Sequence, residues 1–420
     1  KILLADSKII RSLKLKIINK LRPLNSPVFE IPSLNKFLTG QISIDSLKPI
    51  SIEDLLGREP LKPKNELLGP GISGKIILVT GAGGTIGEGL CRRLMELKPK
   101  KLLILDISEY ALYKTHQMLL DLNISLEIIP ILGDCCNVKF LEQLFDKYKI
   151  NTIFHAAAYK HVPLVELNPI NAISNNILST KSICQVALSH AVDNLVFIST
   201  DKAVRPTNIM GASKRLAEII VFAYSQKALS IVDNNEGNLT RYSMVRFGNV
   251  LGSSGSVVPL FLKQIKEGGP ITLTHEKVIR YFMTIEEACL LVLQSLALAR
   301  GGDLFLLDMG EPVSISHLAS QMVLLSGLSI KDKSNPDGDI EIITTGLRPG
   351  EKLYEELLIE GECLKTKHPL IFTSNENTKV PINFSNNLKV LEDLLRNHNE
   401  EKVLEMLKEF VPEWTRFKKN

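Results

Sequence analysis

The chain is poor in several features that would set it apart from ordinary globular proteins. Its 420 residues include one tryptophan and six cysteines, and no two cysteines form a Cys-x-x-Cys pair. The longest apolar run, residues 288–299, is interrupted by Gln294 and Ser295 and falls short of the roughly 20 residues that span a bilayer. There is no secretory signal pattern. These shortages predict a cytoplasmic protein with reduced thiols.

The chain also has no large net charge of either sign. Lys and Arg number 50 against 46 Asp and Glu, a formal balance of +4. This balance gives no reason to expect a nucleic acid as partner. The eight histidines are scattered without metal-ligand spacing, so we predict no metal.

Apolar runs and helical periods alternate through the middle of the chain. The runs that predict buried strands are at 76–79, 102–105, 126–131, 151–155 and 194–198. Helical periodicity between them predicts helices at 109–122, 138–148 and 168–190. This alternation predicts an α/β fold, a doubly wound parallel sheet of the Rossmann type with a smaller C-terminal mixed α/β region.

A glycine-rich loop follows the first of these strands. Residues 80–87 read Thr-Gly-Ala-Gly-Gly-Thr-Ile-Gly and precede a predicted helix. Gly81 allows the tight turn, Gly84 lets the backbone approach a pyrophosphate, and Gly87 lets helix and strand pack closely. Because the helix N-terminus faces the anion, this context predicts a dinucleotide site.

Acidic and small residues end the neighbouring strands. Asp106 lies where ribose hydroxyls bind, about 20 residues after the loop, and its carboxylate repels a 2′-phosphate, so NAD is favoured over NADP. Asp134 is a candidate for the adenine amino group, although strand-end capping is an alternative. The expected cofactor-binding residues are Gly81, Gly84, Thr85, Ile86, Gly87, Asp106, Asp134, Ala156, Ala157, Ala158 and Lys214.

Changes in pattern divide the chain into five parts. Residues 1–50 read as a partial N-terminal α/β unit with strand, helix and strand, and 51–74 as a linker rich in Pro, Gly and Lys. Residues 75–250 form the dinucleotide-binding Rossmann domain, and 251–371 a substrate-binding region. Residues 372–420 form a helical tail, with an amphipathic helix at 388–410.

The densest group of reactive side chains follows the strand at 194–198. Residues 199–202 read Ser-Thr-Asp-Lys, and Met210 and Lys214 follow with Met-x-x-x-Lys spacing. An acid and an amine beside a nicotinamide site indicate that oxidation is followed by elimination. A surface ion pair after a strand is the alternative interpretation of the Asp-Lys pair.

Together these motifs resemble an extended short-chain dehydrogenase/reductase, and within it the CapD-like polysaccharide-biosynthesis branch of nucleotide-sugar 4,6-dehydratases. The resemblance covers about residues 52–372. It rests on Asp-Leu-Leu-Gly-Arg at 54–58, Ala-Tyr-Lys-His-Val-Pro at 158–163, Ser-Thr-Asp-Lys-Ala at 199–203, Arg-Phe-Gly-Asn at 246–249, Arg-Tyr-Phe-Met at 280–283 and Gly-Leu-Arg-Pro-Gly-Glu-Lys at 346–352. It implies an NAD-dependent lyase that dehydrates UDP-N-acetylglucosamine to UDP-2-acetamido-2,6-dideoxy-4-keto-hexose for bacterial glycan biosynthesis.

Roles for the catalytic set follow from that chemistry. We expect Lys202 to take the C5 proton and Asp201 to protonate the leaving hydroxyl, with both pKa values moved toward neutrality in a dry cleft. Thr200 holds O4, whose proton passes to Asp201, and Lys214 binds the nicotinamide ribose. Met210 stands where the wider superfamily has a proton-exchanging tyrosine, and a thioether cannot exchange a proton.

Basic and polar residues further along are the candidates for the substrate. Arg280 and Arg348 suit the diphosphate, because guanidinium groups match phosphate oxygens, although a surface salt bridge is the alternative for either alone. By resemblance, residues 246–249 face the nucleotide sugar. The candidates for the sugar, the uridine and the pocket edge are Lys160, Asn249 and Glu351.

Two other functions stay open, a nucleotide-sugar epimerase and a catalytically inactive nucleotide-sugar-binding scaffold. The Asp-Lys pair argues against the epimerase, since C4 epimerisation needs no eliminating acid. The resemblance implies a homo-oligomer, because helices such as 168–190 commonly pair in the superfamily. The chain begins at Lys1, and the branch carries transmembrane helices before its catalytic half. We therefore expect the intact protein to be anchored at the cytosolic face of the inner membrane.

Overall fold

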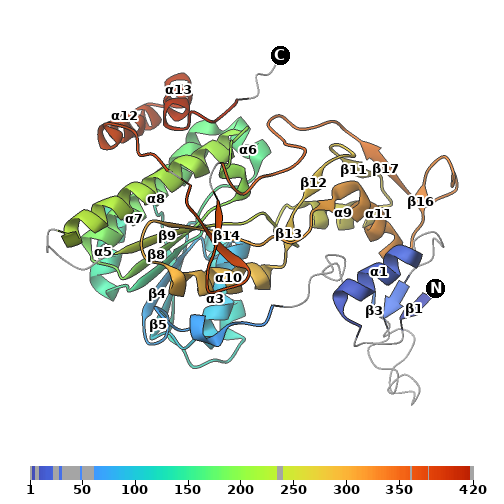
Figure 1. The fold of residues 1–420 in the computed structure, drawn as a ribbon, viewed down its shortest axis with the longest axis horizontal. Helices are drawn as coiled ribbons and strands as arrows, with labels where there is room; N and C mark the ends of the chain where they lie inside the picture. Colours follow the sequence, from blue (N-terminus) through green and yellow to red (C-terminus); the bar gives the residue numbers. More distant parts are fainter. Residues whose placement is uncertain are drawn as a thin grey trace.

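A nine-stranded sheet forms the centre of the molecule, in the order β18-β19-β14-β9-β8-β7-β4-β5-β6 (Figure 1). The computed structural model describes residues 2–4, 9–21, 28–30, 48–49, 61–233, 240–359, 362–376 and 378–416. The strands are β4 (Ile76–Thr80), β5 (Lys101–Asp106), β6 (Ile128–Leu132), β7 (Thr152–His155), β8 (Asn194–Ile198), β9 (Arg241–Arg246), β14 (Asp303–Leu307), β18 (Cys363–Lys365) and β19 (Ile371–Ser374). Neighbours from β14 to β6 pair in parallel, whereas β19 and β18 are antiparallel. The predicted doubly wound α/β class is confirmed.

Helices cover both faces of this sheet (Figure 1). One face carries α3 (Thr85–Glu96), α4 (Glu109–Leu120) and α10 (Ile285–Leu298). The other carries α5 (Val138–Tyr148), α7 (Pro169–Ser189) and α8 (Ile209–Asp233). Successive side chains of a strand point to opposite faces, so the central strands contribute to both buried clusters. This double burial explains why β4 is apolar at positions 76–79.

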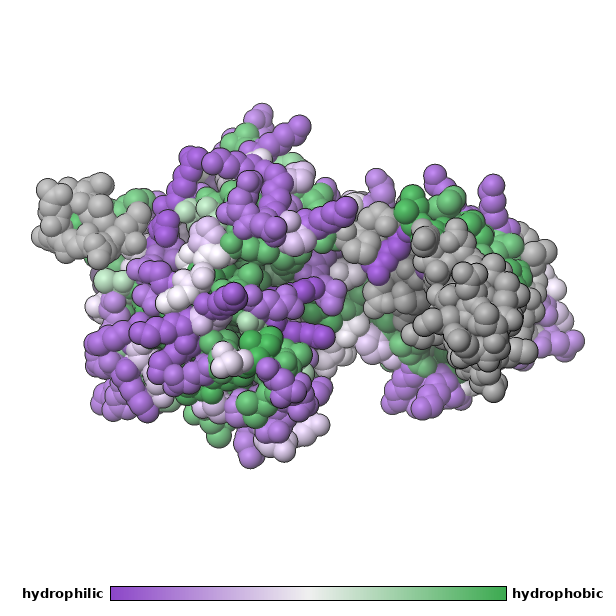
Figure 2. All heavy atoms as spheres, turned by 90° about the horizontal axis from the view of Figure 1, so that it is seen from below, coloured by the Kyte–Doolittle hydropathy of each residue, from purple (hydrophilic) through white to green (hydrophobic). Residues whose placement is uncertain are grey.

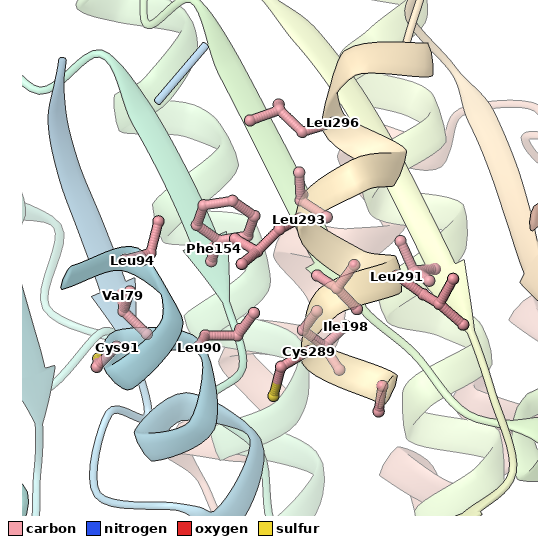
Figure 3. Close-up of a cluster of buried hydrophobic side chains, with 14 of the residues drawn as sticks. Val79, Leu90, Cys91, Leu94, Phe154, Ile198, Cys289, Leu291, Leu293 and Leu296 are labelled. Atoms are coloured by element: carbon pink, nitrogen blue, oxygen red, sulfur yellow. The ribbon is translucent and has the colours of Figure 1, made fainter. Parts of the chain in front are cut away.

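The packing of α10 against α3 closes one of these clusters (Figure 3). Leu90 and Leu94 of α3 and Leu293 of α10 pack over Val79 and Phe154 of the sheet. All five side chains are buried. The N-terminal end of α3, which follows the glycine loop, is thereby held in place against the sheet.

The expected substrate region, residues 251–371, divides between two places. Its α10 and β14 belong to the central layers, because their apolar side chains are buried in the cluster under α3. β18 and the start of β19 also belong to the central sheet, whereas much of the remainder forms a smaller lobe around a separate cluster. Apart from α10 and β14, the elements of residues 249–344 are β10 (Asn249–Val250), α9 (Val257–Lys266), β11 (Ile271–Leu273), β12 (Ile279–Arg280), β13 (Phe282–Met283), β15 (Val313–Ser314), α11 (Ile315–Leu325), β16 (Ile330–Lys331) and β17 (Ile340–Thr344).

The described N-terminal residues pack on this smaller lobe (Figure 1). Their elements are β1 (Ile2–Leu4), α1 (Arg11–Leu21), β2 (Val28–Glu30) and β3 (Lys48–Pro49). β1 pairs in parallel with β2, and β3 pairs antiparallel with β2. Leu4 and Ile18 are buried in the same cluster as Phe261 and Leu318.

The expected linker, residues 51–74, lies within the described residues only from position 61. There it includes the 3-10 helix η4 (Asn65–Leu67). Ile72 is fully buried, and the backbone N–H of Lys64 donates to Gln294 Oε1 of α10 at 2.8 Å. The described part therefore packs on the central domain.

The C-terminal tail contains two helices instead of the one predicted at 388–410. They are α12 (Phe384–Arg396) and α13 (Glu400–Phe410), separated where His398 has a φ of 51° and Asn399 caps α13. Their apolar faces cover α7, α8 and α6 (Val162–Leu167).

On the surface of the molecule, hydrophilic side chains dominate much of the face shown in Figure 2. Across the part of the chain that the structure describes, we find no helix that is both long and apolar enough to span a bilayer.

Candidate active site

A cleft of about 2080 Å³ opens at the carboxyl ends of the parallel strands. The loops after β4, β7, β8 and β9 line one side of it, and residues of the smaller lobe line the other. Open α/β sheets bind their ligands at this edge. The fold therefore brings the glycine loop, the Ser-Thr-Asp-Lys segment and the substrate candidates to one cavity.

Close backbone packing fixes the glycine loop. Gly81 has a φ of 64°, and a Cβ added there would lie 2.6 Å from Ala157 N. A Cβ at Gly87 would lie 2.0 Å from the Gly81 carbonyl oxygen. These glycines thus allow the tight turn and the close contact of helix and strand that a dinucleotide-binding loop requires. The members of the expected cofactor set that line the cleft are Gly81, Gly84, Thr85, Ile86, Gly87, Ala156, Ala158 and Lys214.

The two aspartates of the cofactor set lie at strand ends but are not among the described residues that line the cleft, and neither is Ala157. Asp106 Oδ2 accepts a hydrogen bond from Gly83 N at 2.8 Å, so this carboxylate also braces the glycine loop. Asp134 is exposed, and its Oδ1 accepts from Cys136 N at 2.8 Å. The adenine role of Asp134 remains a prediction.

Thr200 and Lys202 hold the buried carboxylate of Asp201, and Asn249 contacts Lys202. Thr200 Oγ1 and Lys202 Nζ each donate to Asp201 Oδ1 at 2.9 Å. Lys202 Nζ also donates to Asn249 Oδ1 at 3.2 Å. Asp201 is 3% exposed, and Thr200, Lys202 and Asn249 line the cleft. The alternative of a surface ion pair is therefore excluded.

The expected fall in the pKa of Lys202 is wrong for this arrangement. Burial favours the neutral amine, but the carboxylates of Asp201 and Glu355 outweigh burial and raise the pKa above its ordinary value. The reason is the direct ion pair, since an opposite charge within hydrogen-bond distance stabilises the ammonium. Lys202 becomes a base only when the neighbouring negative charge is removed.

Met210 and Lys214 lie one turn apart on α8 and both line the cleft. Met210 is buried among apolar side chains of α7 and α8. Lys214 Nζ donates to the Ile198 carbonyl oxygen at 2.6 Å and lies 3.9 Å from the centre of the Phe197 ring. Burial lowers the pKa of Lys214 to about 7. At neutral pH this amine is therefore close to half protonated.

A buried charge network supports the catalytic segment from behind. Ser199 Oγ donates to Glu218 Oε1 at 2.6 Å, and Arg246 binds the same carboxylate through Nε and Nη2, both at 2.7 Å. Arg246 Nη1 donates to Glu376 Oε2 at 2.7 Å. Arg246 is fully buried. The expectation that residues 246–249 face the sugar therefore fails for Arg246, because two carboxylates hold its guanidinium.

Arg280 lines the cleft, but its guanidinium is largely committed to the protein. Nη1 donates to the carbonyl oxygens of Ile279 at 2.8 Å and Leu353 at 3.0 Å, and Nη2 donates to that of Lys352 at 2.8 Å. Arg280 thus clamps the segment around residue 352 to β12. A diphosphate would have to share this arginine with the backbone.

Three of the predicted substrate-binding residues, Arg348, Glu351 and Lys160, line the cleft. Arg348 is exposed there, and its backbone N–H donates to Glu351 Oε2 at 3.1 Å. Glu351 Oε1 accepts from Thr274 Oγ1 at 2.8 Å. Burial and the nearby Lys202 lower the pKa of Lys160. Of the two arginines, Arg348 is the exposed one, whereas Arg280 is buried.

One residue of the cleft was missed from the sequence. The Glu355 side chain is 6% exposed and lines the cavity, with Oε1 3.9 Å from Arg280 Nη2. The one sequence feature that could have indicated Glu355 is its position shortly after the motif at 346–352. The neighbouring sequence does not distinguish Glu355 from Glu356, which is more exposed and forms an ion pair with Arg205.

His155 has a structural environment, whereas His161 lines the cleft. His155 is buried between Thr80 and Thr180, with ring nitrogens 2.7 Å and 3.2 Å from their hydroxyls. Burial and Lys214 lower its pKa to about 3, so its ring is neutral at physiological pH. Among the described residues, no group of three or more His, Cys, Asp or Glu side chains is placed to hold a metal ion.

The fold and the site together define an extended short-chain dehydrogenase/reductase. The family described as "Polysaccharide biosynthesis protein" matches residues 77–376. The chain therefore belongs to the polysaccharide biosynthesis protein family, and the CapD-like resemblance is confirmed.

Two curated relatives are 42% identical to this chain. The capsular polysaccharide biosynthesis protein CapD of Staphylococcus aureus aligns over 90% of this chain and 60% of its own length. The probable polysaccharide biosynthesis protein EpsC of Bacillus subtilis aligns over 79% and 53%. This chain thus spans just over half the length of these relatives.

Solved structures show the same fold. Pen from Bacillus thuringiensis is 31% identical, with a TM-score of 0.62 over 73% of this chain and 91% of its own. DesIV from Streptomyces venezuelae, a dTDP-glucose 4,6-dehydratase solved with NAD and TYD bound, is 21% identical, with a TM-score of 0.56 over 67% and 88%. The DesIV likeness bears on the fold alone.

Proposed function

We propose that this protein is an NAD-dependent UDP-N-acetylglucosamine 4,6-dehydratase of glycan assembly. The observation that carries the proposal is the buried Asp201-Lys202 pair beside a dinucleotide loop. Such a pair supplies the two proton acceptors, for O4 and for C5, that the reaction needs before water is able to leave C6. The similarity to CapD and EpsC, both named as polysaccharide biosynthesis proteins, supports a place in that process.

The proposal that NAD is the cofactor rests on the glycine loop and on the ends of the strands beside it. Gly84 would lie against the pyrophosphate, while Gly81 and Gly87 allow the turn and the helix packing behind it, and Asp106 ends the neighbouring strand β5. Lys214 lies near the carboxyl end of β8, where it would hold the nicotinamide ribose. When bound, NAD supplies the hydride acceptor and donor of the cycle.

The contacts of Asp201 set the order of the proton transfers. Asp201 receives the O4 proton through Thr200, which lines the cleft and whose Oγ1 already donates to Asp201. A protonated Asp201 no longer stabilises the Lys202 ammonium, so the pKa of Lys202 falls and its amine is able to take the C5 proton. Met210 takes no part in proton transfer, since a thioether has no proton to give.

Arg348, Asn249, Glu351 and Lys160 form the proposed substrate set at the cleft. Arg348 would bind the diphosphate, and Asn249 would contact the sugar while it orients Lys202. A cytoplasmic site, a homo-oligomer and anchoring of the intact protein at the membrane remain predictions.

Incubation with UDP-N-acetylglucosamine in heavy water, without added NAD, tests this function. We expect a product lighter by one water with deuterium at C5. Epimerised sugar without water loss would support the epimerase instead, and tight binding without turnover would support the inactive scaffold.

Lys202→Ala should abolish incorporation of deuterium at C5. Lys75→Ala is the matched control, because Lys75 forms a partly exposed ion pair with Asp193 outside the cleft. Retention of full activity by Lys202→Ala would show that Lys202 is not the base.

A further inference from the structure

We propose that Glu355, and not Asp201, is the general acid that protonates the C6 hydroxyl as it leaves. The inference rests on the proposed dehydratase function and assigns one step of it to a residue that the sequence did not reveal. Glu355 enters the cleft from the segment after β17, more than a hundred residues beyond the Ser-Thr-Asp-Lys motif.

Access to the cavity separates the two carboxyl groups. Glu355 lines the cleft, whereas Asp201 is not among the described residues that do. The carboxylate of Asp201 is held by Thr200 and Lys202, both of which stand at the cleft surface. A general acid must reach the oxygen that it protonates, at about 2.6–3.2 Å. Glu355 itself lines the cavity in which such an oxygen would lie, whereas Thr200 and Lys202 stand between the cavity and Asp201.

The bonding of Glu355 leaves a place for a ligand. Its Oε2 is buried and has no hydrogen-bond partner among the residues that the structure describes. Its Oε1 lies 3.9 Å from Arg280 Nη2, beyond hydrogen-bond length. A buried carboxyl without a partner is costly, and this cost falls when the carboxyl is protonated and donates to a bound hydroxyl.

The surroundings of Glu355 favour that protonated form. Burial raises the pKa of this carboxyl, and Asp201 adds to the rise, although the cation of Lys202 opposes it. Two nearby carboxyl groups in different surroundings are a common arrangement for separate acid and base roles.

Hydrogen bonds from side chains to backbone oxygens hold the segment before Glu355 next to the residues that follow the Asp-Lys pair. Lys352 Nζ donates to the Val204 carbonyl oxygen at 2.9 Å, and Asn208 Nδ2 donates to that of Gly350 at 3.2 Å. These bonds tie the segment before Glu355 to the residues that follow the Ser-Thr-Asp-Lys motif. A rigid link of this kind keeps an acid within reach of one point on the substrate.

Every proton of the reaction is accounted for when Asp201 and Glu355 both take part. Asp201 gains the O4 proton, and Lys202 takes the C5 proton, exchanges it with solvent and later gives a proton back to C5. As the C5–C6 double bond forms and the C6–O bond breaks, Glu355 gives its proton to the departing oxygen, which leaves as water. Asp201 is then protonated and Glu355 ionised, so one proton must pass between them before the next turnover.

Glu355→Gln tests this assignment in the full chain with UDP-N-acetylglucosamine in heavy water. We expect the variant to keep exchanging the C5 proton, detected as deuterium in recovered substrate, while water loss falls roughly 100- to 10 000-fold. A substrate with fluorine in place of the C6 hydroxyl needs little acid help. The variant should therefore release fluoride at a rate near that of the unmodified protein, which also shows that it is folded. Glu355→Asp should recover part of the water loss.

Glu356→Gln is the matched control, since Glu356 is paired with Arg205 outside the cleft. Water loss by Glu355→Gln at the unmodified rate would overturn the assignment. An equal fall in C5 exchange, water loss and fluoride release would also overturn it, because a positioning role affects every step. If the unmodified protein itself exchanges C5 without losing water, the proposed function fails and the acid role fails with it.

Discussion

Lys214 shows how burial can tune a single side chain. Its amine donates to a neutral carbonyl and lies against an aromatic ring, and its pKa is lowered to about 7. In the unfolded chain the ordinary value of 10.5 applies. Between these two values the unfolded state binds more protons than the folded state. The free energy of unfolding therefore rises with pH in this window.

Lys214→Met tests that linkage. From pH 7 to pH 9 the contribution of Lys214 should add about 2 kcal/mol to the free energy of unfolding, and the variant should lack this rise. Urea unfolding of both dinucleotide-free proteins at the two pH values gives the difference. Lys75→Met, at a partly exposed position, controls for the lost charge. Parallel pH dependence in the unmodified protein and Lys214→Met would contradict the prediction.

Met210 is a packing residue on the wall of the cleft. Met210→Leu keeps the volume and removes the sulfur, so we expect turnover to stay within about threefold of the unmodified rate and stability to change by less than about 1.5 kcal/mol. Steady-state kinetics and urea unfolding measure the two quantities. A hundredfold loss of turnover at unchanged stability would give the thioether a chemical role.

At the scale of elements, the network of Glu218 and Arg246 joins α8 to β9 behind the active site. Arg215 and Glu376 extend it, with Arg215 Nη1 3.0 Å from Glu218 and 2.8 Å from Glu376. Burial opposes the charge of Glu218, but Arg246 outweighs burial and lowers the pKa of this carboxyl to about 2. The network therefore contributes stability above the ordinary pKa of 4.5, and the contribution is lost as the pH falls toward 2.

Glu218→Gln should lower the free energy of unfolding at pH 7 by about 3–5 kcal/mol, because it leaves a buried arginine short of a counter-charge. The gap to the unmodified protein should narrow between pH 4.5 and 2. Urea unfolding across this range measures both effects. Glu96→Gln, in an exposed pair with Arg93, should change stability by less than about 1 kcal/mol. An equally small effect of Glu218→Gln would contradict the account.

Local patterns were enough to predict some of these elements, and long-range packing decided the others. The glycine loop and β4 carry their signals within about ten residues, so both could be read directly. β14 could not be placed, since an apolar segment does not indicate which sheet it joins. The break at His398 was missed because the apolar period continues through it. Glu355 was missed because only the fold brings it to Lys202, more than a hundred residues away.

At the scale of the whole molecule, the C-terminal tail completes the core over α7 and α8. Trp414, the one tryptophan of the chain, is 1% exposed within this cluster. The next residue, Thr415, donates its N–H to the Pro206 carbonyl oxygen at 3.0 Å, close to the catalytic segment. The tail is therefore part of the same folded unit as the site.

Trp414→Ala should lower the free energy of unfolding by about 3–5 kcal/mol, because it leaves a large cavity. Trp414→Phe should cost less, since the indole Nε1 has no hydrogen-bond partner among the described residues. Denaturant unfolding followed by circular dichroism compares the variants. A Trp414→Ala protein within 1 kcal/mol of the unmodified one would show that the tail unfolds separately.

The central claim is that one bound dinucleotide both oxidises C4 and reduces C6 of the same sugar. UDP-N-acetylglucosamine labelled with deuterium at C4 tests it directly, by mass spectrometry and NMR of the product formed in ordinary water. We predict a product that has lost one water and carries the label at C6. Label that stays at C4 or is absent from the product would contradict the account.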